Sequence, residues 1–239
     1  MTKNSFKLKA LSFFVAVGSV LTGQAYAGSN DLYVGPQYSS GINLLLNGNA
    51  TSFDGGSMNP STLNGLGLKS LWCIDLADDT VVDSHYLKTA VTFNGGITAT
   101  VNGVGSNFTV NNAGQIAYVV NSFTPLIGTR AKGLDGNAVN EQKAIQALIW
   151  SKEYNSGSYV ITADPTAAYY KDFSILQNLA ANKSMALNTA YWISPDNGSG
   201  TVFQALVAPG ITALPEPEEW AMMLLGLPLI GWAVRRKRA

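Results

Sequence analysis

Apolar residues in the first half of the chain occur in short runs separated by Gly, Asn and Ser, a pattern that predicts β-strands joined by turns. The run from Leu71 to Leu76 is compact and is closed by Asp78 and Asp79, as expected for a buried strand. Residues 47–68 have little periodicity and many small polar residues, so an exposed loop is expected there. The other expected strands are 31–35, 42–46, 108–110, 158–162, 185–193 and 201–207, with a hairpin of 91–93 and 97–101.

The apolar period then lengthens and predicts helices over residues 114–123, 141–154 and 165–182. Asn140 is expected to cap the second helix, and Pro165 fits the first turn of the third. The apolar stripe of the second helix is Ala144, Ile145, Leu148 and Ile149. The predicted fold is therefore mainly β, sandwich-like or barrel-like, with two or three inserted helices.

The first 27 residues have the organisation of a secretory signal peptide. Three lysines precede an apolar helical run over residues 10–23, and Ala25 and Ala27 supply the small residues that a signal peptidase reads. Cleavage is expected after Ala27, and a retained N-terminal anchor is the less favoured alternative because the apolar run is short.

The other end of the chain, residues 214–239, combines a Pro/Glu hinge, an uncharged run and a basic cluster. Residues 220–234 form a hydrophobic helix of roughly 22 Å if fully helical, short for a bilayer core of about 30 Å. Flanking tryptophans and cations extend that reach at the interfaces, so this segment is expected to occupy the inner membrane transiently. A plain C-terminal membrane anchor is the alternative. The basic stop consists of Arg235, Arg236, Lys237 and Arg238.

Pro215, Glu216 and Pro217, followed by a short hydrophobic helix and an arginine-rich end, resemble the PEP-CTERM sorting signal of Gram-negative bacteria. The resemblance implies recognition by an exosortase, cleavage near the motif, and export to the cell surface or the extracellular matrix. The chain then divides into a signal peptide (1–27), an extracellular domain (28–213) and a sorting signal (214–239).

Composition narrows the function of the central domain. Residues 28–214 contain eight basic and twelve acidic residues, a net charge of −4, and no basic stripe, which argues against nucleic-acid binding. The chain has one cysteine, Cys73, and one histidine, His85, so an internal disulfide is impossible and a zinc site is not expected. No cofactor is expected.

Two residues stand out as candidates for chemistry, and each has an ordinary explanation when taken alone. Cys73 lies in an apolar strand, where a cysteine usually acts as a small buried hydrophobe. Gln146 shares a helical band with Gln142 and Glu153 that is normally exposed to solvent, although Ile149 and Trp150 border it.

Taken together, the two segments resemble the Cys–Gln thioester domains of bacterial surface proteins. The resemblance rests on Trp72-Cys73-Ile74-Asp75 and on Gln146-Ala147-Leu148-Ile149-Trp150, with Ile145 where that family usually has Thr. It implies a thioester-domain-like fold and an internal Cys73–Gln146 thioester that an amine of a partner opens, leaving a covalent cross-link without enzymatic turnover. The alternative is a non-covalent structural or carbohydrate-binding component of the exopolysaccharide or biofilm matrix.

Three further patterns are weaker. Asp75, Asp78, Asp79 and Asp83 are acidic but lack the spacing of a calcium loop, so a solvated strand end is favoured. Asp83-Ser84-His85 places hydrolase-type residues together in sequence, without the elbow motif of a serine hydrolase. Gly65 and Gly67 begin a dinucleotide-type pattern that Ser70 breaks.

Overall fold

The computed structural model describes residues 26–76, 78–101, 104–156, 159–197 and 203–210. Within these residues the chain is mainly β with three α-helices, which confirms the predicted fold class at that level. Ala25, the sorting motif at 215–217 and the basic stop at 235–238 lie outside the described residues. In the part that is described, no helix has both the length and the apolar character needed to cross a membrane.

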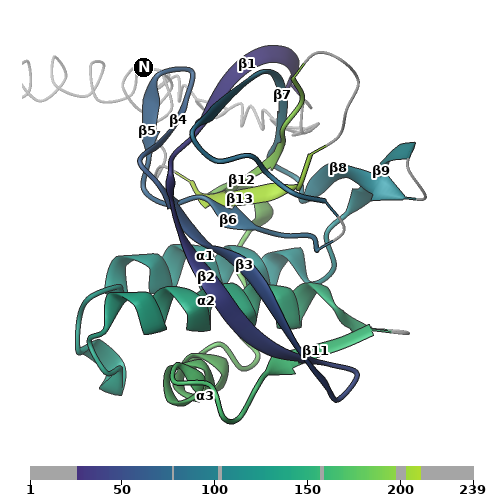
Figure 1. Cartoon of the computed structure of the whole chain (residues 1–239). Coiled ribbons are helices and arrows are strands. Elements are labelled where there is room, and N and C mark those ends of the chain that lie inside the picture. The colour runs from purple at the N-terminus through teal and green to yellow at the C-terminus, as the bar shows by residue number, and fades with distance from the viewer. Residues whose placement is uncertain (1–25, 77, 102–103, 157–158, 198–202, 211–239) are drawn as a thin grey trace, which may run out of the picture.

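The larger sheet is antiparallel and joins strands from both ends of the described chain (Figure 1). Strand β6 (Trp72–Cys73) lies at one edge of this sheet, where it pairs with β13 (Leu206–Pro209). In spatial order the strands are β5 (Leu66–Leu68), β4 (Ser61–Leu63), β1 (Tyr26–Val34), β7 (Ser84–Thr92), β12 (Ala190–Ser194), β13 (Leu206–Pro209) and β6 (Trp72–Cys73).

A second sheet is built around the long hairpin of β2 (Gln37–Leu46) and β3 (Asn49–Asn59). The prediction of an exposed loop over residues 47–68 is wrong, because β3, β4 and β5 all fall within it. Strand β3 is held by backbone pairing with β2 rather than by an apolar face of its own, so hydrophobic periodicity does not reveal it. The sheet is completed by β11 (Tyr159–Ala163) and β10 (Asn155–Ser156).

The predicted hairpin of residues 91–93 with 97–101 is also wrong. Residues 91–92 belong to β7, which pairs with β1 and β12, whereas β8 (Gly96–Val101) pairs with β9 (Val104–Thr109). The Asn-Gly-Gly turn therefore lies between two strands that belong to different sheets. The two closing strands begin later than predicted. Strand β12 begins at Ala190 instead of residue 185, and β13 begins at Leu206 instead of residue 201.

All three predicted helices are present, as α1 (Ala113–Phe123), α2 (Ala138–Glu153) and α3 (Tyr170–Leu179). The cap of α2 is Asn137 instead of the predicted Asn140, and its side-chain oxygen accepts the N–H groups of Val139 and Asn140. Helix α3 starts at Tyr170 rather than at the predicted residue 165. Pro165 therefore lies in the preceding turn, in which Asp164 accepts the N–H of Thr166, and not in the first turn of the helix.

Helix α2 is the centre of the packing. It contacts α1 and α3, and the β2–β3 hairpin and β11 pack against it as well (Figure 1). Its predicted apolar stripe is buried, but so are Gln146, Ala147 and Trp150 outside that stripe. Neighbours surround α2 on several sides. The β2–β3 hairpin therefore encloses Gln146, which a helical wheel assigns to the solvent face.

Candidate functional site

The fold brings Cys73 and Gln146 into direct contact, although 73 positions separate them in the chain. The Cys73 N–H donates to Oε1 of Gln146 at 3.0 Å, and Nε2 of Gln146 donates to the Cys73 carbonyl at 2.7 Å. Strand β6 thus holds the Gln146 carboxamide through two hydrogen bonds. Both residues are buried, with Cys73 3% exposed and Gln146 fully enclosed.

A third contact to this carboxamide comes from β3. The Gly56 N–H donates to Oε1 of Gln146 at 3.1 Å, so two backbone donors converge on one carbonyl oxygen. Two N–H groups at such distances polarise a carbonyl and stabilise negative charge that develops on its oxygen. The Gln146 carbonyl is therefore polarised by backbone donors from two different strands.

The close approach of β3 to α2 requires glycine at two adjacent positions. A β-carbon on Gly55 would lie 2.9 Å from the Trp150 ring and 3.2 Å from Cγ of Gln146. Gly56 has a φ of +94°, a backbone conformation that side chains disfavour. Sequence reasoning missed both residues, although a Gly-Gly pair inside a polar stretch was the available signal of close backbone contact.

The environment of the thiol favours its protonated form. Burial raises the pKa of Cys73 far above that of a free cysteine, and the nearby carboxylates of Asp75 and Asp79 add to this effect. A resting thiolate is therefore disfavoured at neutral pH. Ile145, the residue before Gln146, is buried in the core and supplies packing.

The acidic residues near β6 serve the structure of the adjoining loops. Asp75 is buried, and its carboxylate accepts the N–H groups of Ala205 at 2.5 Å and of Asp78 at 3.2 Å. Asp83 lies elsewhere and accepts the hydroxyl of Tyr33 at 2.7 Å. Among the residues that the structure describes, no group of three His, Cys, Asp or Glu side chains is placed to hold a metal ion.

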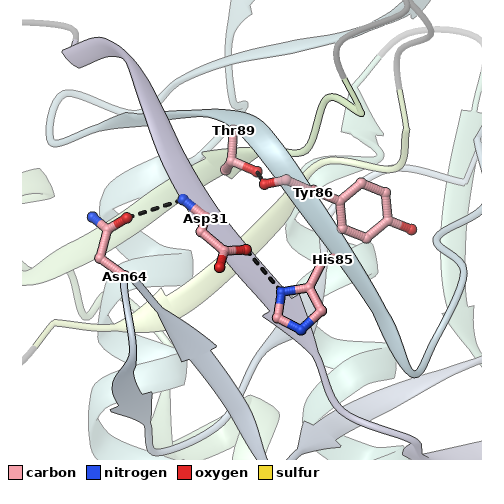
Figure 2. Close-up of polar contacts among 5 residues, drawn as sticks. All are labelled: Asp31, Asn64, His85, Tyr86 and Thr89. Carbon is pink, nitrogen blue, oxygen red and sulfur yellow. Dashed lines mark hydrogen bonds and ion pairs between the residues drawn. The ribbon is translucent and has the colours of Figure 1, made fainter.

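His85 does not form a triad with its sequence neighbours. Its Nδ1 lies 2.9 Å from a carboxylate oxygen of Asp31 on β1, and both side chains are exposed (Figure 2). The Ser84 hydroxyl instead donates to the Val82 carbonyl, and the Asp83 carboxylate is engaged by Tyr33. Figure 2 also shows the next residue, Tyr86, pointing to the opposite side of the strand.

A buried carboxyl group ends the helix that carries Gln146. One oxygen of Glu153 accepts from Asn111 at 3.3 Å, and the other is buried without a hydrogen-bond partner. Burial raises the pKa of Glu153 to about 7, and the neighbouring charge of Asp75 acts in the same direction.

Stability is therefore expected to fall as Glu153 ionises. In the unfolded chain Glu153 ionises near its ordinary pKa, and in the folded protein it ionises near pH 7. Between these two pKa values the folded state binds more protons than the unfolded state. Stability therefore falls as pH rises through this range. Compared with the native chain, Glu153→Gln should gain on the order of 2 kcal/mol in free energy of unfolding between pH 5 and pH 8. Urea unfolding of both proteins at pH 5 and pH 8 measures this difference in free energy of unfolding. The same difference at both pH values would contradict the expectation.

Comparison of the whole chain with protein-family models, with curated proteins and with solved structures found no match.

Proposed function

We propose that this protein is an exported surface or matrix protein that attaches covalently to amines of a partner through a thioester between Cys73 and Gln146. The observation that carries the proposal is the pair of N–H groups, from Gly56 and Cys73, that converge on Oε1 of Gln146. These two donors polarise the carbonyl, and the amide nitrogen donates to the backbone carbonyl of Cys73, so the carboxamide is held beside the cysteine.

The proposed reaction balances without a cofactor. The Cys73 sulfur attacks the carbonyl carbon of Gln146, the C–N bond breaks, and the thiol proton leaves with the amide nitrogen as ammonia. During attack, negative charge on Oε1 is stabilised by the two backbone donors. The product is a thioester, which remains electrophilic because sulfur donates little electron density to the carbonyl.

The closed form places no charge on the buried sulfur. The thioester is neutral and is not penalised by the apolar surroundings that raise the pKa of the Cys73 thiol. An amine that attacks the Gln146 carbonyl carbon forms a C–N bond, breaks the C–S bond, and supplies the proton that restores the thiol. Each molecule reacts once, so the protein acts as a cross-linker and not as an enzyme.

The ends of the chain complete the proposal. The signal peptide (1–27) would direct export, and the PEP-CTERM-like tail (214–239) would be recognised by an exosortase in the inner membrane. The mainly β domain with its three helices would then act as a thioester-like domain at the cell surface or in the matrix of a Gram-negative bacterium. Its position outside the cell fits a reaction with exposed amines of other molecules.

The experiment is an intact-mass measurement of the purified protein before and after incubation with methylamine. We expect a mass lower by one ammonia than the sequence requires, and one methylamine added at Gln146 after incubation. Gln142, one turn earlier on the same helix, serves as an internal control and should stay unlabelled.

Cys73→Ala is expected to have the full sequence mass and to take up no methylamine. If that variant does not fold, the native chain still decides the question. A native protein of full mass that takes up no methylamine would contradict the proposal.

A further inference from the structure

A groove lies between the end of β3 and the start of α2. It consists of two cavities of about 450 and 330 Å³ whose walls share Ser57, Asn59 and Gln142. The two cavities therefore adjoin one another at the end of β3 and the start of α2, and are together called the β3–α2 groove below. Neither Cys73 nor Gln146 lines either cavity.

Three residues in the walls link the β3–α2 groove to the Cys73–Gln146 pair, two by their position in the chain and one by a hydrogen bond. Ser57 directly follows the glycine whose N–H holds Gln146, and Gln142 precedes Gln146 by one turn of α2. Thr124, in the wall of the larger cavity, accepts the indole N–H of Trp72 at 3.2 Å, and Trp72 is the neighbour of the cysteine. Both members of the pair are thus linked to the groove through an intervening residue.

Serine and glutamine side chains in the walls of the groove are hydrogen-bonded to one another. The Ser57 hydroxyl donates to the Ser70 hydroxyl at 2.9 Å, and the Ser39 hydroxyl donates to Oε1 of Gln142 at 3.2 Å. Rotating such side chains takes far less time than opening a packed core.

The groove has a positive rim. Lys69 lies in the wall of the larger cavity and Lys143 in that of the smaller one, and the described residues that line the two cavities include no carboxylate. The Lys143 ammonium donates to the Gly41 carbonyl at 3.3 Å. The exposed Asp54 accepts the Gly41 N–H but does not line either cavity.

We propose that the β3–α2 groove admits the attacking amine and that Lys69 and Lys143 select a lysine flanked by carboxylates on an acidic peptide segment. This inference rests on the proposed thioester. Two cations repel a basic segment and attract an acidic one. The partner is thus an acidic protein surface that presents a lysine.

The test compares three amines by the rate at which each adds to Gln146, followed by intact mass at low ionic strength. The probes are methylamine and two capped pentapeptides, Gly-Glu-Lys-Glu-Gly and Gly-Arg-Lys-Arg-Gly. We expect the acidic peptide to react about tenfold faster than the basic one. The ratio should shrink in 1 M salt, where the screening length is about 3 Å.

Two double variants locate the cause of this preference. Lys69→Gln with Lys143→Gln should bring the peptide ratio close to one while leaving the methylamine rate within about twofold. Lys88→Gln with Lys183→Gln makes the same change in net charge at exposed positions outside the groove and should preserve the ratio.

Equal peptide rates in the native protein, or a ratio that survives the first double variant, would overturn the inference. Methylamine addition without a peptide preference removes this inference alone. The absence of methylamine addition removes the proposed thioester and this inference together.

Discussion

Gly55→Ala is expected to destabilise the protein and to slow amine addition at Gln146 about a hundredfold. The new β-carbon would lie 2.9 Å from Cη2 of Trp150 and 3.2 Å from Cγ of Gln146. Trp150 is fully buried and its ring is rigid, so β3 must move away from α2. Overpacking of this kind costs about 1–3 kcal/mol.

The same movement acts on the reactive group. It lengthens the bond from the Gly56 N–H to Oε1 of Gln146, which is 3.1 Å in the native structure, and so weakens one of the two donors that stabilise the oxyanion. Thermal unfolding measures the first effect, and intact mass after methylamine treatment measures the second.

Gly67→Ala is the matched control for Gly55→Ala. Gly67 also lies in a strand, has no atom within 4 Å of an added β-carbon and does not have a left-handed backbone conformation. It should leave both the melting temperature and the rate of amine addition nearly unchanged. A folded Gly55→Ala protein that adds methylamine at the native rate would show that β3 does not position the carboxamide.

Glu141→Ala is expected to cost about 2–4 kcal/mol of stability. Glu141 is fully buried in the first turn of α2, where its carboxylate accepts the N–H of Gly128 and, at 3.1 Å, the N–H of Gly136. These two charge-assisted bonds attach the connector between α1 and α2 to the helix that carries Gln146. Removing them leaves a cavity and two amide groups that lose a charged acceptor.

Denaturant unfolding of a small set of variants checks this expectation. Glu141→Gln keeps one side-chain oxygen as an acceptor and should lose less stability than Glu141→Ala. Val139→Ala, two residues earlier on an exposed part of the same helix, should change the free energy of unfolding by less than about 1 kcal/mol. Equal losses in Glu141→Ala and Val139→Ala would contradict the tethering role of the carboxylate.

The helices and the two reactive residues were accessible from sequence because each signal is local. Helices α1 and α2 follow the 3.6-residue apolar period to within a few residues of the predicted bounds. Cys73 and Gln146 were singled out by short motifs in two separate segments. The cap of α2 was misplaced by three residues, because Asn137 and Asn140 are both suitable capping residues and only the backbone path distinguishes them.

The surroundings of the Cys73–Gln146 pair could not be predicted from local sequence signals. Strand β3 looks like a loop because its hydrogen-bond partners belong to β2 and its contact with α2 is made by glycine. The burial of Gln146 depends on the β2–β3 hairpin that covers α2, and no helical wheel contains that information. Similarly, Asp83-Ser84-His85 suggested a hydrolase, but alternation along β7 and the pairing with β1 give His85 a different carboxylate, Asp31.

The sequence by itself determined a mainly β fold with two or three helices, the single cysteine and the mild negative charge of the central domain, because composition and periodicity depend only on neighbouring residues. The tertiary structure alone decided that Gly56 and Cys73 direct their N–H groups to one oxygen of Gln146. That convergence joins β3, β6 and α2 across 90 positions of the chain, and backbone N–H groups have no residue identity that a sequence could reveal.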